Sequence, residues 1–164
     1  MIQDIAPHFL NNTFIPGMRP EDDDLLVIFS DDRILFCVDK EAKKFDFPTV
    51  GELKARGLED ENLVYLFAVD EKNIFISLDA NVEADDRFDY YPMGEIRRMD
   101  LQPRTMVFAA FTAYHLARWY ADNRYCGRCG RPTVPDTTSC LPRMNGLRIT
   151  IATTHSSLII PSSK

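Results

Sequence analysis

The sequence predicts an α+β fold. We expect an N-terminal domain of short, mostly antiparallel strands with one long buried helix, followed by a small cysteine-containing unit and an irregular tail. Three observations lead to this prediction. Short apolar runs rich in β-branched and aromatic residues alternate with polar breaks. A later segment has helical spacing of its apolar residues. The composition then changes abruptly after residue 125.

Two hairpins are expected from the apolar runs. "LLVIFS", 25–30, and "RILFCV", 33–38, are separated only by two aspartates, which favours a tight turn. "NLVYLFAVD", 62–70, and "NIFISLD", 73–79, are joined by Glu71-Lys72 and should pair in the same way. Cys37 lies inside the second run, where we expect it to be a small buried hydrophobe.

The segments around these hairpins predict shorter elements. "GELKARG", 51–57, can form a short helix that Gly57 closes. Residues 80–92 are polar and rich in turn formers, so they should form a loop. This loop should lead to a strand around Glu95–Met99.

One long helix is expected over 103–123. It begins near Pro103 and contains no glycine or further proline up to Asn123. Phe108, Leu116 and Trp119 widen its apolar surface, which predicts burial on most sides. His115 is better explained as a structural histidine than as a catalytic one. The i, i+3, i+4, i+7 stripe consists of Val107, Ala110, Phe111, Tyr114 and Ala117.

Charge and aromatic content divide the chain near Cys126. All 18 aromatic residues precede it, in a part with 14 basic and 24 acidic residues. The last 39 residues carry five basic residues and one acidic residue. The net charge of −6 argues against a general nucleic-acid or anionic-membrane binder. Because no apolar run approaches a membrane span and the N-terminus lacks a signal-peptide pattern, the sequence predicts a cytoplasmic protein.

"YCGRCG" contains the pattern most closely tied to chemistry. Cys126 and Cys129 have the spacing of a zinc knuckle, and the glycines that follow each cysteine suit its tight turns. The remaining candidate ligands, Cys140 and His155, give C-x2-C-x10-C-x14-H, which is not a common zinc module. A redox pair is less favoured, because the cysteines follow a helix instead of starting one. Both interpretations stay open on the residues alone.

The chain resembles a known family in "MIQDIAPHFLNNTF", "LQPRTMVFAAFTAYHLARWYADNRYCGRCG" and "PTVPD". These stretches look like the N-terminal domain and first zinc knuckle of bacterial NADH pyrophosphatases, which are Nudix hydrolases that split NAD(H) into a nicotinamide mononucleotide and AMP. The resemblance covers about residues 1–136. It implies an N-terminal domain at 1–123 and a partial zinc ribbon at 124–140, with an atypical tail at 141–164.

The resemblance also implies site residues and partners. Cys126 and Cys129 would be the first pair of structural zinc ligands, with Cys140 a weak third candidate. Arg97, beside Arg98, would be a substrate contact in a strand before the long helix, although a solvated surface charge explains it equally well. The family acts on NAD(H), in some cases on NAD-capped RNA, with Mg or Mn as catalytic metal. A homodimer is possible, and no membrane partner is expected.

The sequence departs from the family after Asp136. It contains neither a second CxxC nor the glutamate-rich Nudix box that holds the catalytic metal. Hydrolysis of a pyrophosphate needs such metals, so these residues should not be catalytic by themselves. A frameshifted or misjoined tail would explain the change, and reading the downstream DNA in the other two frames would test it. A free-standing nucleotide- or partner-binding regulatory module is the alternative, and a zinc-knuckle nucleic-acid binder is the least favoured.

Overall fold

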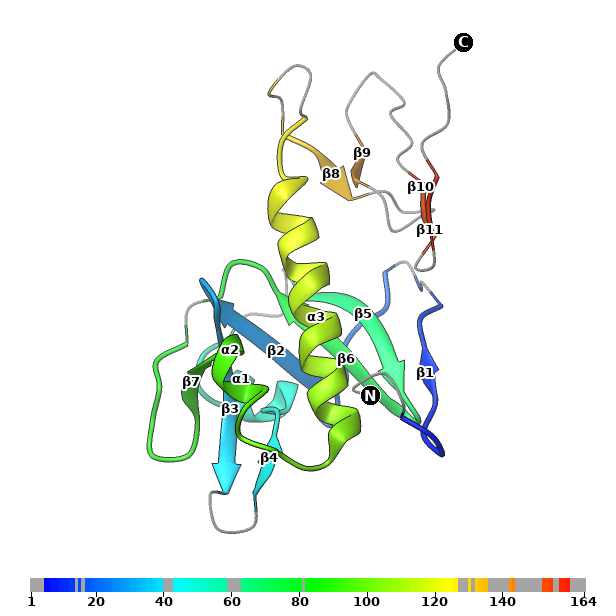
Figure 1. Cartoon of the computed structure of the whole chain (residues 1–164). Coiled ribbons are helices and arrows are strands. Elements are labelled where there is room, and N and C mark those ends of the chain that lie inside the picture. The colour runs from blue at the N-terminus through cyan, green and yellow to red at the C-terminus, as the bar shows by residue number, and fades with distance from the viewer. Residues whose placement is uncertain are drawn as a thin grey trace.

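The computed structural model describes residues 5–13, 15, 17–39, 43–58, 63–80, 82–126, 130, 132–135, 142–143, 152–154 and 157–159. Its main feature is a seven-stranded sheet with the strand order β1-β5-β6-β2-β3-β4, in which β7 pairs with β3. All of its pairings are antiparallel except the one between β2 and β6. The predicted α+β class is therefore confirmed (Figure 1). The strands are β1 (Leu10–Asn11), β2 (Leu25–Ser30), β3 (Arg33–Asp39), β4 (Lys44–Asp46), β5 (Leu63–Val69), β6 (Lys72–Ser77) and β7 (Asp89–Pro92).

Both predicted hairpins form. β2 and β3 pair through Phe29↔Ile34 and Ser30↔Arg33. β5 and β6 pair along their length, with a bulge between Tyr65 and Phe67. The second turn lies one residue earlier than expected, at Asp70-Glu71, because Lys72 already pairs with Val69. Each turn begins with an aspartate in the left-handed region, at φ 55° for both Asp31 and Asp70, a conformation that Asp tolerates better than most residues.

The predicted short helix is α1 (Val50–Lys54). Thr49 forms a capping box with Glu52: the Thr49 hydroxyl accepts the Glu52 N–H at 3.2 Å, and the Glu52 carboxylate accepts the Thr49 N–H at 3.0 Å. The chain leaves the helix through Gly57, at φ 90°, which agrees with its expected role as the closing residue.

The strand predicted around Glu95–Met99 is wrong. The strand in this region is β7, which ends at Pro92, and it is followed by the short helix α2 (Met93–Ile96) and a turn over 97–100. The burial pattern explains the difference. Met93 and Ile96, three residues apart, are both buried, whereas a strand over 95–99 would place Glu95 and Arg97 on the same face as Met99.

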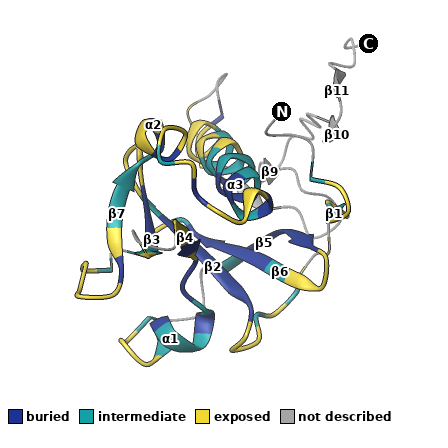
Figure 2. Ribbon diagram, turned by 60° about the horizontal axis from the view of Figure 1, so that its bottom comes forward, coloured by how far each residue is buried: buried dark blue, intermediate teal, exposed yellow. Residues whose placement is uncertain are grey.

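The long helix is α3 (Arg104–Asp122), close to the predicted bounds. It packs across one face of the sheet, with α1 on the opposite side (Figure 2). The expected burial on most sides is wrong, because only one face of the helix meets the sheet. Phe108, Leu116 and Trp119 are half-buried, and His115 is exposed. The buried positions of the helix are Thr105, Val107, Ala109, Ala110 and Ala113.

Alternate residues of the central strands serve two cores. On β2, Leu25 and Val27 belong to the core beneath α3, while Leu26 and Ile28 belong to the core that includes α1. Cys37 packs at the margin of the second core and is half-buried, so it is less buried than expected.

Residues beyond α3 form two short antiparallel pairs. β8 (Val134–Pro135) pairs with β9 (Pro142–Arg143), and β10 (Ala152–Thr154) pairs with β11 (Ser157–Ile159). Within the described part of the chain, no helix is long and apolar enough to cross a membrane.

Candidate functional site

The candidate metal centre begins where α3 ends. The last turn of the helix is closed by Asn123, whose side-chain amide donates to the Trp119 carbonyl at 2.7 Å. Three residues further on, Cys126 is buried, with 9% of its surface exposed. The helix and its cap therefore place the first predicted zinc ligand in a sheltered position just beyond the N-terminal domain.

A backbone hydrogen bond joins Cys126 to Gly130. The Gly130 N–H donates to the Cys126 carbonyl at 2.8 Å. Gly130 has φ 68°, in the left-handed region that favours glycine. The predicted requirement for a residue with positive φ at the end of the CxxCG sequence is thus met at Gly130.

The chain then returns alongside the segment that enters the turn. Tyr125 and Pro132 form an antiparallel bridge, and the Thr133 N–H donates to the Arg124 carbonyl at 2.9 Å. The Thr133 hydroxyl donates to the Asn123 carbonyl. The turn containing Cys126 therefore lies at the tip of a small hairpin that is attached to the end of α3.

The remaining predicted ligands cannot be placed beside Cys126. Cys129, Cys140 and His155 lie outside the described residues. Among the residues that the structure does describe, no group of three or more His, Cys, Asp or Glu side chains is arranged to hold a metal ion. On donor chemistry, the Cys126 and Cys129 thiolates suit zinc, and they could supply two of the four ligands of a structural site.

Arg97 does not lie where the resemblance implied. It is the exposed residue that follows α2, in a turn and not in a strand. It also lines neither of the cavities described below. The expectation of a strand position for this arginine is therefore corrected.

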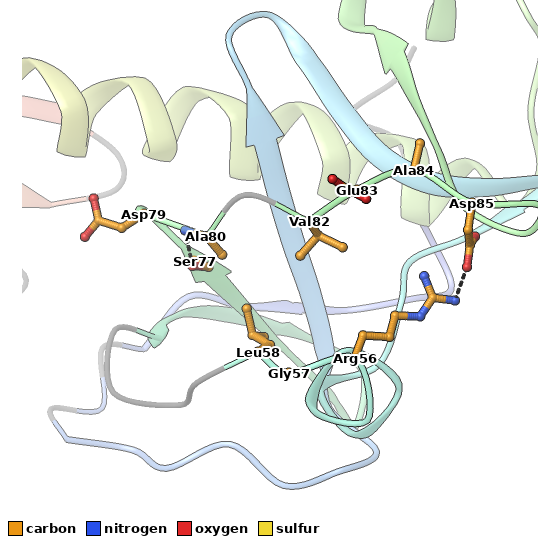
Figure 3. A pocket seen from close by; sticks show the side chains of 10 residues that line it. All are labelled: Arg56, Gly57, Leu58, Ser77, Asp79, Ala80, Val82, Glu83, Ala84 and Asp85. Atoms are coloured by element: carbon orange, nitrogen blue, oxygen red, sulfur yellow. Dashed lines mark hydrogen bonds and ion pairs between the residues drawn. The ribbon is translucent and has the colours of Figure 1, made fainter.

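The larger cavity has a volume of about 760 Å³ and lies beyond the end of β6 (Figure 3). Its apolar wall includes Leu58 and Val82. At one end, the Arg56 guanidinium lies 2.5 Å from the Asp85 carboxylate. Ser77 is 6% exposed, and its Oγ accepts the Ala80 N–H at 3.0 Å.

Asp85 organises one wall of this cavity. Its Oδ1 accepts the Arg87 N–H at 2.9 Å and the Phe88 N–H at 2.7 Å. The bond from Phe88, with smaller contributions from the Arg87 N–H and the Arg56 guanidinium, holds the pKa of Asp85 below its usual value. The Arg56 and Arg87 guanidinium groups lie over the Phe88 ring, 5.1 and 4.9 Å from its centre. These contacts fix the 85–88 turn against the residues that follow α1.

The second cavity, of about 440 Å³, lies between the β2–β3 turn and the C-terminal half of α3. The Tyr114 hydroxyl donates to Asp32, and Arg118 donates to the same carboxylate oxygen at 3.2 Å. The Phe29 and Tyr114 rings lie 5.6 Å apart. The hydrogen bond to Tyr114 and the nearby Asp32 carboxylate raise the pKa of Arg118.

The two cavities lie on opposite faces of the sheet and meet only at the end of β6. Ser77 lines both. Asp79 lines the larger cavity and forms an ion pair with Arg124, which lines the smaller one. Since Arg124 is two residues before Cys126, the same segment borders the cavities and begins the knuckle.

Sequence reasoning did not find this arrangement. Asp32 was recognised only as a turn residue, and Tyr114 only as part of an apolar stripe. The four-residue spacing of Tyr114 and Arg118 on one helix face was a usable signal for a polar patch. Their shared partner Asp32, 82 residues from Tyr114, could not be inferred from spacing.

No protein-family model matches the chain, and no curated protein or solved structure matches it.

Proposed function

We propose that this chain acts as the accessory, zinc-knuckle part of an NADH pyrophosphatase-type protein and does not hydrolyse NAD(H) by itself. The observation that carries the proposal is the turn after Cys126. A glycine at positive φ closes it, and its N–H returns to the cysteine carbonyl. This geometry, at the tip of a hairpin, is what a CxxCG zinc knuckle requires.

In this proposal the knuckle has a structural role. Cys126 and Cys129 would each supply a thiolate, and the bound zinc would hold the hairpin closed at the end of α3. Because a structural zinc contributes directly to folding free energy, its loss should affect the hairpin more than the N-terminal sheet. The sheet has its own buried core of strands covered by α3.

Catalysis is not proposed for these residues. In the family that the sequence resembles, glutamates of a Nudix box hold Mg or Mn, and the 164 residues contain no such box. The metals would neutralise charge on the pyrophosphate and activate water.

The metal content of the purified chain tests the knuckle. We expect about one zinc per chain in the wild type, retention of zinc in Cys37→Ser, and its loss in Cys126→Ser. Cys37 is the matched control, because it lies within β3 in the N-terminal domain. A wild-type zinc content near zero, or equal zinc content in the two variants, would refute the proposal.

Incubation with NADH and Mn²⁺ tests the statement on catalysis. We expect no AMP above the level in buffer. Turnover that survives repurification and disappears on unfolding would contradict the argument from the missing Nudix glutamates.

A second candidate function is a module that binds a small ligand or a partner subunit. The two cavities favour it, because each has a volume in the range that small molecules occupy. This candidate does not depend on the presence of zinc.

A further inference from the structure

The side of α3 that is turned away from the sheet carries two large aromatic residues that belong to neither core (Figure 2). Phe108 and Trp119 are half-buried, and neither packs against the core beneath α3 or the core that includes α1. They lie about three turns apart along one side of the helix, with the exposed His115 between them. Aromatic side chains of this size outside the core are typical of a surface that contacts another protein.

Opposite charges mark the two ends of this outer side of α3. Arg104 and Asp122 are the first and last residues of the 19-residue helix, and both are exposed. Each lies about two and a half turns from the fully buried Ala113, and therefore on the opposite side of the helix from it. Within the part of the chain that the structure describes, neither forms an ion pair. Arg118, one turn before Asp122, is already bound to Asp32.

The signs of these charges are the reverse of those that stabilise a single helix. The first turn of a helix favours acidic side chains and the last turn favours basic ones, because of the helix dipole. α3 has no acidic residue in its first turn and no basic residue in its last turn. A second helix that runs in the opposite direction would compensate for this, because it would bring its own Asp122 to the first turn and its own Arg104 to the last.

The pattern on the outer side of α3 is self-complementary about the middle of the helix. Phe108 lies about one turn after Arg104, and Trp119 lies about one turn before Asp122. Two antiparallel copies of α3, related by a two-fold axis at the level of Ala113, would place Phe108 of each copy against Trp119 of the other. The same arrangement would place Arg104 beside Asp122 at both ends. A two-fold axis makes every such contact twice.

We propose that the outer side of α3 is the contact surface between two copies of this chain, with the two helices antiparallel. Aromatic contacts form the middle of this surface, and charge pairs at its ends fix the direction of the helices. The inference goes beyond the proposed function and does not depend on zinc, because α3 belongs to the N-terminal domain. One side of a single helix offers less area than a standard interface, so we expect a weak dimer.

Sedimentation equilibrium of the full chain tests the proposal, with a reducing agent present to prevent disulfide-linked dimers. We expect the average mass to rise from that of one chain toward that of two as the concentration increases from about 10 µM to about 1 mM. A chain that stays monomeric over this range would overturn the proposal and leave the surface to a different partner.

Charge reversal distinguishes the antiparallel contact from other modes of association. Arg104→Glu and Asp122→Arg should each weaken dimerisation at least tenfold, because each turns two symmetry-related attractions into repulsions, and one pair near 4 Å is worth about fivefold in water. Each change also gives its end of the helix the charge that the dipole favours, so folding should be preserved. The double variant restores opposite charges and should dimerise like the wild type. Single variants with wild-type dimerisation, or a double variant as weak as the singles, would refute the antiparallel arrangement.

Two further variants separate the aromatic contact from a general effect of charge. Trp119→Ala should weaken dimerisation about tenfold, because buried tryptophans dominate the energy of many interfaces, and unchanged dimerisation would count against the proposal. Arg19→Glu is the matched control for Arg104→Glu: Arg19 is exposed and follows Met18, which packs on the core that includes α1. Its dimerisation should stay within about twofold of the wild type, and an equal loss in the two arginine variants would contradict the proposal. Circular dichroism shows whether each variant is folded, and the charge reversals decide the question if Trp119→Ala is not.

Discussion

Replacing Asp24 by alanine should lower the free energy of unfolding by about 2 kcal/mol. Asp24 is 7% exposed and lies at the entrance to β2. One carboxylate oxygen accepts the Glu21 N–H at 2.8 Å, and the other accepts the Asn73 side-chain amide at 3.0 Å. The carboxylate therefore connects the loop before β2 to the neighbouring strand β6.

The magnitude follows from the two donors that alanine would leave without an acceptor. A hydrogen bond to a charged group contributes about 1.5–3 kcal/mol to the free energy of unfolding. Both of these bonds are only part-buried, so water can replace some of the lost interaction. Asp24→Asn keeps one acceptor oxygen and should lose roughly half as much, about 1 kcal/mol.

Urea denaturation at neutral pH, followed by circular dichroism, measures the effect. Asp23→Ala is the matched control, because Asp23 is the exposed neighbour in the same loop. Its free energy of unfolding should stay within about 0.5 kcal/mol of the wild type. An equal loss in the Asp23 and Asp24 variants would show that the buried carboxylate does not hold this loop.

Two further predictions use the same denaturation assay. Gly51→Ala should destabilise the fold, because the added Cβ would lie 3.0 Å from the Asp22 Cβ and 3.1 Å from the Asp22 carbonyl oxygen. Gly94→Ala should instead stabilise α2 by up to about 1 kcal/mol, because the space around Gly94 is open. A lower free energy of unfolding for Gly94→Ala than for Gly51→Ala would refute this reasoning. Burial raises the pKa of Tyr65 and Tyr90 above 10.0, so folding favours their protonated form. Stability should be complete below pH 10.0 and fall as the pH rises toward the raised pKa values, and a flat alkaline profile would contradict it.

The cavities and the knuckle give different sources of evidence about function. The proposed zinc-binding role depends on Cys126 and Gly130. The larger cavity, whose wall includes Leu58 and Val82, is the basis of the second candidate, ligand binding.

Local patterns in the sequence were enough for much of the fold. The hairpin turns at Asp31 and Asp70 follow from short polar breaks between apolar runs. The α1 capping box and the glycine that ends that helix are also encoded within a few residues. The short helix α2 was missed because Met93 and Ile96 form too brief an apolar pattern to separate a helix from a strand.

The sequence by itself determined the strand-rich first part, the long helix and the turn chemistry at Gly130, because each depends on neighbours in the chain. Only the tertiary structure decided that β2 pairs in parallel with β6, with Leu25 beside Ile74. It also brought Asp32 to Tyr114 across 82 positions and placed a cavity on each face of the sheet near the end of β6. Such contacts depend on which faces of the sheet and of α3 pack together in the folded protein, and the spacing of residues along the chain does not specify this.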